Sequence, residues 1–343
     1  MTAKINFNIR IGVVLAAMMC SITSFAQDIH FSQFFEAPLL RNPSLAGIYT
    51  GDIRVQAVYR DQWNSVTTAY KTGSLNAEYK MPVGKGDDFL TAGLQVMYDK
   101  AGTAVLSATH ILPALNYHKS LSTETNRYLS LGFMAGPVQR RIDRSKMTTN
   151  SQYDGLGDGE NFESNSYTYF DGAVGMSFNS QLTDNKDDNF FIGLAYHHFN
   201  KPKNSFYRNE TFTLQPKYVG SIGVKFGVTD ISYITLQADH SIQGAFKETV
   251  GGALYGVKLV EGQEGYLYTL HAGAFLRVED AIIPVVKLDY NPFSVSLSYD
   301  VNISKLRTSS MGRGGFELGI SYIGFVERKK GTSAINATLC PRF

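Results

Sequence analysis

The sequence predicts an all-β protein, a single transmembrane antiparallel β-barrel of the outer-membrane type with about 14 strands. Three observations predict it: apolar and polar residues alternate in runs along the whole chain, the runs are long, and long and short connections between them alternate. Runs of about 10–14 residues suit a tilted bilayer crossing, which needs about 9–11, whereas strands average about five or six.

The first 26 residues have the features of a secretory signal peptide. Lys4 and Arg10 form a basic start, an apolar stretch follows, and Ser24-Phe25-Ala26 is a small-x-small cleavage site. We therefore expect cleavage after Ala26 and export from the cytoplasm, which leaves a soluble protein, a peripheral protein or a β-barrel in the outer membrane. The strand pattern described below favours the outer membrane. Cys20 fits a lipoprotein signal poorly, because Met19 precedes it.

Residues 27–50 do not alternate, and prolines and glycines interrupt them. We expect an N-terminal periplasmic or plug segment over 27–50, followed by the barrel over 51–343. Removing Lys4 and Arg10 from the 32 basic residues leaves 30, which equals the number of acidic residues. A neutral chain lacks the basic surface that nucleic-acid binding requires.

The alternating runs define the expected strands in order. They cover 51–62, 69–80, 89–99, 105–118, 127–139, 167–181, 189–199, 216–228, 231–241, 249–259, 266–277, 281–290, 292–302 and 314–326. The run from Phe293 to Ile303 is the clearest, because each odd-numbered residue is apolar or aromatic and each even-numbered residue is polar.

The polar face of these runs carries charges of both signs. The expected inner-wall charges include Arg54, Glu78, Asp289, Asp300 and Glu317. In a soluble β-sandwich the same face would be exposed to water and the apolar face would be buried, so alternation alone leaves this alternative open. Because an open edge is costly in hydrocarbon, the first and last strands must pair, which brings Arg54 and Arg60 near Glu78 and Glu317. Mixed charge inside favours a braced or plugged lumen.

Connection lengths and aromatic residues favour the barrel. The long connections 140–166, 200–215 and 303–313 all fall on one side of the expected barrel, and short ones such as 229–230 fall on the other. The chain has 20 Tyr and 22 Phe, many at run ends, where outer-membrane barrels carry aromatic girdles.

Two sets of residues resemble a known family. Near the N-terminus they are Gln33, Pro38, Asn42, Pro43, Ala46, Gly47, Tyr59, Arg60, Gln62 and Trp63. Near the C-terminus they form Asp280-Ala281-Ile-Ile-Pro284, Leu288-Asp289-Tyr290-Asn-Pro292-Phe293-Ser294, Ser298-Tyr299-Asp300-Val-Asn302 and Gly314-Gly315-Phe-Glu317. These segments resemble the PorP/SprF family of outer-membrane barrels from the type IX secretion and gliding machinery of Bacteroidetes-type bacteria. The middle of the chain, about 140–215, carries no comparable motif.

This resemblance implies a protein that is not an enzyme and uses no cofactor. Family members hold secreted, C-terminally tagged adhesins at the cell surface, or connect the secretion apparatus to the outer membrane and to peptidoglycan-binding partners. The expected partners are therefore outer-membrane lipid, a secreted type IX substrate and a periplasmic component of the machinery. A porin or a transporter of small hydrophobic molecules is the alternative of similar architecture.

The candidate partner-binding residues are those of the N-terminal motif: Asn42, Pro43, Gly47, Tyr59, Arg60, Gln62 and Trp63. Asn42, Pro43 and Gly47 could form a plug or docking site, or a turn that packs against the barrel. Arg60 could hold a carboxylate of a bound protein, although an inner-wall ion pair is favoured. Trp63, the only tryptophan, is favoured as a membrane-interface anchor.

Catalytic and metal sites lack support in the sequence. The acidic loop 154–161 departs from a calcium loop at Leu156 and Asn165, so an acidic surface loop is favoured. His197 and His198 are adjacent in an expected strand, so we expect them on opposite faces. No motif for a nucleophilic serine, a zinc protease or a phosphate-binding loop occurs.

Overall fold

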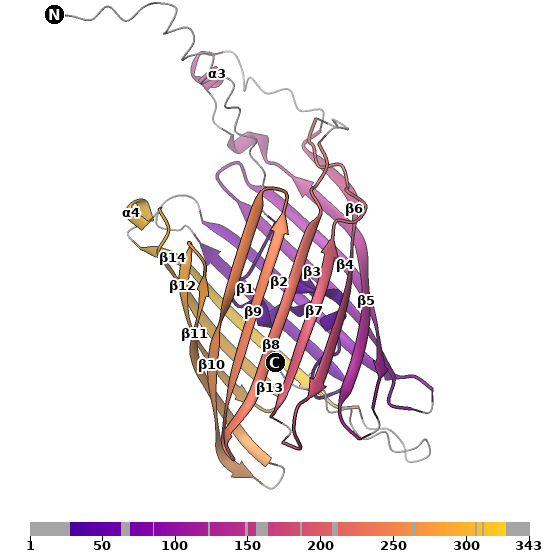
Figure 1. Ribbon diagram of the computed structural model, residues 1–343. Coiled ribbons are helices and arrows are strands. Elements are labelled where there is room, and N and C mark those ends of the chain that lie inside the picture. Colours follow the sequence, from indigo (N-terminus) through magenta and orange to yellow (C-terminus); the bar gives the residue numbers. More distant parts are fainter. Residues whose placement is uncertain are drawn as a thin grey trace, which may run out of the picture.

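The computed structural model describes residues 28–326, apart from 63–68, 85, 123, 148–149, 156–163, 186, 208–211, 263–264, 306 and 311. The expected signal peptide, Trp63, most of the acidic loop and Cys340 lie outside the described residues. Over the described residues the chain forms one closed antiparallel barrel of 14 strands (Figure 1), which confirms the predicted fold class.

The strands follow one another around the barrel in chain order. They are β1 (Ile53–Gln62), β2 (Tyr70–Pro82), β3 (Phe89–Ala101), β4 (Leu106–Ser120), β5 (Arg127–Arg141), β6 (Ser166–Gln181), β7 (Asn189–His197), β8 (Lys217–Thr229), β9 (Ser232–Gln243), β10 (Phe246–Gly262), β11 (Gly265–Arg277), β12 (Ala281–Tyr290), β13 (Phe293–Asn302) and β14 (Arg313–Gly324). β1 pairs with β14, with Arg60 opposite Glu317, so the sheet has no free edge. Because the closed sheet leaves no strand edge unpaired, the barrel can stand in hydrocarbon.

Alternation decides which face each residue takes. Along β13, Phe293, Val295 and Leu297 are exposed on the outer surface, whereas Ser296 and Asp300 face inward and are buried. An apolar outer face is suited to contact with lipid. An inner face of Ser, Asp and Asn needs hydrogen-bond partners inside the lumen.

The two ends of the barrel differ, as the connection lengths predicted. The connections 142–165, 198–216 and 303–312 lie at one end, here called the long-loop end, which also carries η3 (Arg144–Lys146), α3 (Asn150–Tyr153) and α4 (Arg307–Ser310). The turns 83–88, 121–126, 182–188 and 230–231 lie at the other, the short-turn end. In outer-membrane barrels the longer loops face outward and the shorter turns face the periplasm.

One pair of residues departs from its predicted placement. β7 ends at His197 rather than continuing to 199, and His198 adopts the left-handed region with φ 57°. This turn rotates His198 inward, so both imidazoles are buried, with ring centroids 6.3 Å apart. The prediction that the two rings face opposite sides was wrong because it assumed an unbroken strand.

Residues 28–50, here called the lumenal segment, run through the inside of the barrel. The segment contains three short helices, η1 (Phe34–Glu36), α2 (Pro38–Arg41) and η2 (Pro43–Leu45). Figure 1 shows its indigo ribbon within the outline of the strands. None of the helices in the described part of the chain is long and apolar enough to cross a bilayer.

The core of the protein lies between the lumenal segment and the wall. Phe34 and Phe35 pack against Phe275 of β11, with ring centroids 5.3 Å apart in both pairs. Leu39 and Ala46 pack against Leu112, Met134 and Val138 on the opposite side. The inner wall is therefore apolar where the lumenal segment touches it, which buries the large side chains of both.

Candidate functional site

The lumenal segment owes its compact path to local sequence. Pro38 and Pro43 each begin a short helix, where a missing backbone N–H costs nothing. The Asn42 side chain accepts a hydrogen bond from the Ser44 backbone N–H at 2.9 Å and so caps η2. The chain thereby folds into short turns that fit the width of the barrel.

Asn42 and Pro43 fix the segment to the β5–β7 wall. The Asn42 amide donates to the backbone oxygen of Leu194 at 3.1 Å. Glycines make room for this contact: a Cβ on Gly175 would lie 1.8 Å from Asn42 Oδ1, and one on Gly132 would lie 2.4 Å from the Pro43 backbone carbon. Wall and segment are therefore complementary in shape, and Asn42 and Pro43 are buried in the lumen rather than exposed to a partner.

Gly47 fixes the segment near the short-turn end. Its backbone N–H donates to Glu78 Oε2 at 2.7 Å, and Arg54 holds the same carboxylate at 2.7 Å. Gly47 adopts φ +83°, and a Cβ there would lie 2.1 Å from the Thr91 hydroxyl oxygen. Only glycine fits this position, on both conformational and steric grounds.

Two ion pairs hold the middle of the segment. Arg41 binds Asp239 through two hydrogen bonds of 2.7 and 2.5 Å and stacks over the Phe34 ring at 4.6 Å. Glu36 accepts from Lys287 at 2.6 Å and from the Gln56 amide at 3.0 Å. A bidentate arginine–carboxylate pair fixes orientation as well as position.

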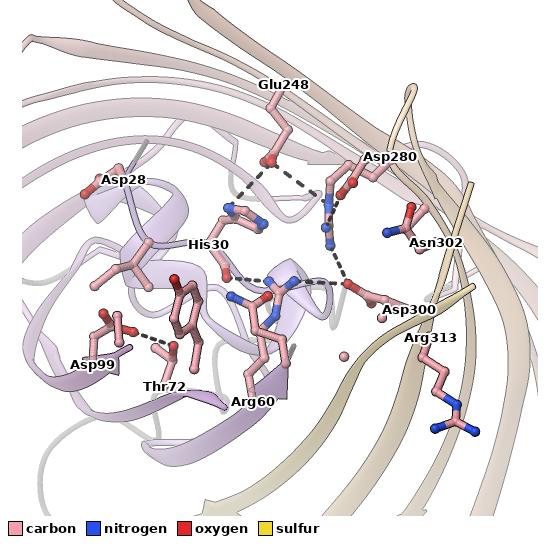
Figure 2. Close-up of a pocket in the computed structure, with 18 of the residues that line it drawn as sticks. Asp28, His30, Arg60, Thr72, Asp99, Glu248, Asp280, Asp300, Asn302 and Arg313 are labelled. Carbon is pink, nitrogen blue, oxygen red and sulfur yellow. Dashed lines mark hydrogen bonds and ion pairs between the residues drawn. The ribbon is translucent and has the colours of Figure 1, made fainter. Parts of the chain in front are cut away.

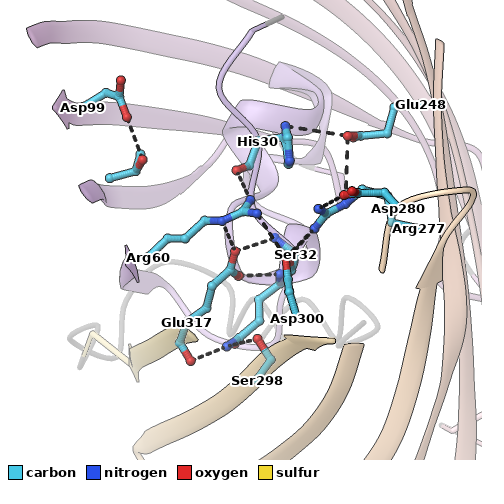
Figure 3. A network of polar contacts seen from close by, with 12 residues as sticks. His30, Ser32, Arg60, Asp99, Glu248, Arg277, Asp280, Ser298, Asp300 and Glu317 are labelled. Atoms are coloured by element: carbon cyan, nitrogen blue, oxygen red, sulfur yellow. Dashed lines mark hydrogen bonds and ion pairs between the residues drawn. The ribbon is translucent and has the colours of Figure 1, made fainter. Parts of the chain in front are cut away.

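A larger network joins the start of the segment to β1, β11, β13 and β14 (Figure 3). The Glu317 carboxylate accepts from the Ser32 and Gln33 backbone N–H groups, both at 2.7 Å, and Arg60 lies 3.3 Å from it. Asp300 pairs with Arg60 at 3.0 Å and with Arg277 at 3.1 Å. Opposite charges are therefore compensated within the network, as buried ions require.

Asp28 lies at the long-loop end. His198 contacts Asp28 at 3.3 Å and Asp171 at 2.8 Å, and Lys217 lies 3.5 Å from Asp28. Burial opposes the charged imidazole, but the two carboxylates outweigh it and raise the pKa of His198 to about 9. Burial also opposes ionisation of Asp28, but Lys217 and His198 hold the pKa of its carboxyl well below its usual range. The N-terminal end of the lumenal segment is thus held by charged groups at neutral pH.

Above the segment the barrel opens into a cavity of about 810 Å³ at the long-loop end, here called the outer cavity (Figure 2). Its floor is Asp28, Ile29, His30 and Arg60, and its walls come from β2 to β5 and from β10 to β14. Burial, with Arg277 and Arg60 nearby, holds the pKa of His30 well below its usual range, so His30 is neutral. Its 3.6 Å contact with Glu248 is therefore no ion pair at neutral pH. This volume is within the range of sites that enclose a small ligand.

The sequence-predicted residues fall into three places. Asn42, Pro43, Gly47 and Arg60 lie inside the lumen, Gln62 lines the outer cavity, and Tyr59 is on the outer surface. The predicted inner-wall charges Arg54, Glu78, Asp289, Asp300 and Glu317 all face inward, with Asp289 3.0 Å from His271. Of the two roles expected for Arg60, the structure shows the ion pair on the inner wall.

Sequence reasoning missed the partners that the lumenal segment itself supplies. Asp28, Ser32, Glu36 and Arg41 each bind a wall residue. Their separation from those partners ranges up to 285 residues, so no local pattern reveals the pairing. The charged residues of the segment could have indicated that it pairs with the wall, since buried charges in a lumen need partners. Among the described residues no group of three His, Cys, Asp or Glu could hold a metal ion.

Comparisons with known proteins agree with this architecture. A family model described as "Type IX secretion system membrane protein PorP/SprF" matches residues 23–322. A search of curated proteins finds no significant match to the chain. Among solved structures, the toluene transporter TbuX of Ralstonia pickettii is 11% identical, with a TM-score of 0.52 and coverage of 89% of this chain and 96% of that one. The P. putida toluene transporter TodX is 11% identical, with a TM-score of 0.47 and coverage of 85% and 95%.

Proposed function

Because the chain belongs to the PorP/SprF family of type IX secretion system membrane proteins, we propose that it binds and anchors a secreted, C-terminally tagged surface protein, or links the secretion apparatus to the outer membrane. In either role the protein is a non-enzymatic outer-membrane barrel. It is exported by the signal peptide over residues 1–26, works with the gliding machinery, and contacts a periplasmic or peptidoglycan-binding component.

One observation carries this proposal: the lumen is occupied. Between the outer cavity and the short-turn end, the lumenal segment meets the wall through apolar contacts on two sides and through ion pairs at Asp28, Glu36 and Arg41. A solute pathway needs an open or readily opened lumen. A barrel closed by its own chain is better suited to hold a protein at its mouth.

The long-loop end offers the surface for such a partner. The longest connections lie there, around the outer cavity. Loops displayed on a rigid barrel are a common place for recognition, because the scaffold fixes their ends. We assign the periplasmic contact to the short-turn end on the same topological grounds.

A porin or a transporter of small hydrophobic molecules is the alternative. TbuX is a toluene transporter, but at 11% identity its likeness shows the fold alone. Transport would require the lumenal segment to move out of the lumen, and measurements of conductance or solute uptake test this.

The test is an affinity purification of the tagged protein from detergent-solubilised outer membranes, with mass spectrometry of what is recovered. We expect a large secreted surface protein or a peptidoglycan-binding lipoprotein. In parallel, the purified barrel is reconstituted in liposomes, where we expect neither ion conductance nor toluene uptake. Recovery of the barrel alone together with conductance or uptake would replace the anchoring function with transport.

A further inference from the structure

Basic side chains face outward from the barrel wall at its long-loop end. On the described strands these residues are Lys71, Lys100, Arg141, Lys247 and Arg313. The same face of the described strands carries one carboxylate near this end, that of Asp61. In an outer-membrane barrel the outward-facing residues at the ends of the strands meet the head groups of the bilayer rather than its hydrocarbon. The head-group level at this end therefore has an excess of positive charge on the strands.

Three of these cations lie in one row across neighbouring strands. Lys71 is directly opposite Lys100 in the pairing of β2 with β3. Ser107 of β4 stands between Lys100 and Arg141 in the same row. Because neighbouring strands lie about 4.8 Å apart, the two lysines are side by side and Arg141 is about 10 Å beyond Lys100.

Asp61 compensates only part of the charge in this row. Its carboxylate lies 3.8 Å from Lys71 Nζ, and the Lys71 side chain is 52% exposed, so the pair is weak. No carboxylate of a described residue pairs with Lys100 or Arg141. Like charges directly opposite each other destabilise a sheet, so an anion between Lys71 and Lys100 would stabilise the wall.

A groove on the outer wall lies next to the two lysines, on their short-turn side. It encloses about 360 Å³ and crosses β14, β1, β2 and β3. Gly73 leaves it open, because a Cβ there would meet nothing within 4 Å. Gly73 and Tyr98, which both line the groove, are two residues from Lys71 and Lys100, about 7 Å along each strand. Apolar side chains provide much of the remaining lining: Leu75, Val96, Leu318 and Ile320.

The groove and the lysines together fit one kind of occupant, a lipid with an anionic head group. An acyl chain would cover the apolar lining, and a phosphate would lie between the two ammonium groups. A free anion would leave the groove unfilled, and a neutral lipid would leave Lys71 and Lys100 uncompensated. Cationic side chains at the level of the head groups attract anionic lipids.

We propose that this groove binds a phosphate-bearing membrane lipid from the leaflet at the long-loop end, with its phosphate between Lys71 and Lys100 and an acyl chain along the groove. Arg141 adds to the attraction from the same row. The proposal goes beyond the anchoring function and does not rest on it, because it concerns the lipid-facing wall rather than the lumen or the loops.

Quenching of tryptophan fluorescence by brominated acyl chains tests the proposal. In a Trp63→Phe barrel, Tyr98→Trp places a reporter in the wall of the groove. Tyr79→Trp, also outward-facing, places a control reporter near the short-turn end of β2. Each barrel is reconstituted in vesicles of phosphatidylcholine and anionic phosphatidylglycerol, with bromine on one lipid or the other. Quenching then measures which lipid lies against each reporter.

We expect the Tyr98→Trp reporter to prefer phosphatidylglycerol about fivefold or more, because each lysine near an anionic lipid contributes about fivefold. The preference should fall as salt rises from about 50 to 200 mM. The Tyr79→Trp reporter should show little preference. Equal preference at the two reporters overturns the proposal. Quenching at Tyr79→Trp but not at Tyr98→Trp also overturns it, because a protein surface then covers the groove.

Lys100→Gln and Lys119→Gln form a matched pair of variants in the Tyr98→Trp barrel. Each removes one outward-facing lysine from a strand, and Lys119 lies at the short-turn end, 2.8 Å from Asp88. Lys100→Gln should lower the preference for phosphatidylglycerol about fivefold, whereas Lys119→Gln should leave it unchanged. Equal preferences in the two variants overturn the proposal. If Lys100→Gln lacks the heat-modifiable band of a folded barrel, Lys71→Gln takes its place with the same expectations.

Discussion

Gly132→Ala should loosen the lumenal segment from the barrel wall. Gly132 lies on β5 and faces inward, where a Cβ would lie 2.4 Å from the Pro43 backbone carbon and 2.5 Å from the Ser44 nitrogen. These are backbone atoms, so no side-chain rotation can relieve the overlap. Asn116 holds the same turn through donors 2.6 and 2.8 Å from the Ser44 and Ala46 oxygens.

The size of the effect follows from these contacts. Overpacking a tight site costs about 1–3 kcal/mol. Each displaced hydrogen bond adds about 0.5–1.5 kcal/mol. If the overlap is relieved by moving the turn, both Asn116 bonds are lost. We therefore expect Gly132→Ala to lower the free energy of unfolding by about 2–6 kcal/mol.

The matched control is Gly73→Ala. Gly73 is also on a strand, but a Cβ there meets nothing within 4 Å. Replacing glycine in a strand reduces the freedom of the unfolded chain, so this control should be neutral or more stable by up to about 1 kcal/mol. Comparing the two separates contact with the lumenal segment from the general effect of adding a methyl group.

Both variants are measured by denaturant unfolding in detergent, followed by the heat-modifiable shift on gels, and by conductance in planar bilayers. We expect Gly132→Ala alone to unfold at lower denaturant and to show transient openings. Equal unfolding free energies for the two variants, within about 0.5 kcal/mol, would refute the close packing of η2 against β5.

Three further outcomes follow. Arg41→Ala should lower the unfolding free energy by about 3–5 kcal/mol because it leaves the Asp239 carboxylate buried, and Arg41→Ala with Asp239→Ala should lower it less; additive losses in a double-mutant cycle would contradict the pair. His198 has a pKa of about 9 against an ordinary 6.5, so its contribution to stability is complete below pH 6.5 and is lost as pH rises through 9. The unfolding free energy of wild type should fall by at most about 3 kcal/mol over this range, and a His198→Gln variant with the same pH profile would contradict this. With Cys340 replaced by Ser, Ile29→Cys in the outer cavity should react with a membrane-impermeant maleimide on intact cells, whereas Val83→Cys at the short-turn end should not, and the reverse pattern would invert the orientation.

Within the lumen, the sequence predicted the wall but not what fills it. Arg54 and Glu78 were expected inside and near each other, and they meet at 2.7 Å because they stand opposite each other in the register of β1 and β2. Closure of β1 on β14, which lipid requires, places Arg60 opposite Glu317. Asn42, Pro43 and Gly47 were expected either as a plug or docking site or as a turn against the barrel. The sequence left this open because the choice depends on glycines elsewhere, such as Gly132 and Gly175.

The apolar stretch Ala281–Val286 shows where local reading reaches its limit. Ile282 and Val286 face outward, and Ile283 and Val285 face inward, where they join the cluster with Phe34 and Phe35. Such an unbroken apolar run is a sign of apolar contact on both faces. Its inner partner lies about 250 residues earlier in the chain, so the run alone could not name it.

The sequence by itself determined the number and length of the strands, the face that each residue takes, and which connections are long. These depend on period-two alternation and on the thickness of the bilayer, both of which act locally. Only the tertiary structure decided that residues 28–50 fill the lumen and that Asp28, Glu36 and Arg41 of this segment pair with Lys217, Lys287 and Asp239 of the wall. These depend on which side chains meet across the barrel, and barrel closure brings together residues that no local pattern connects.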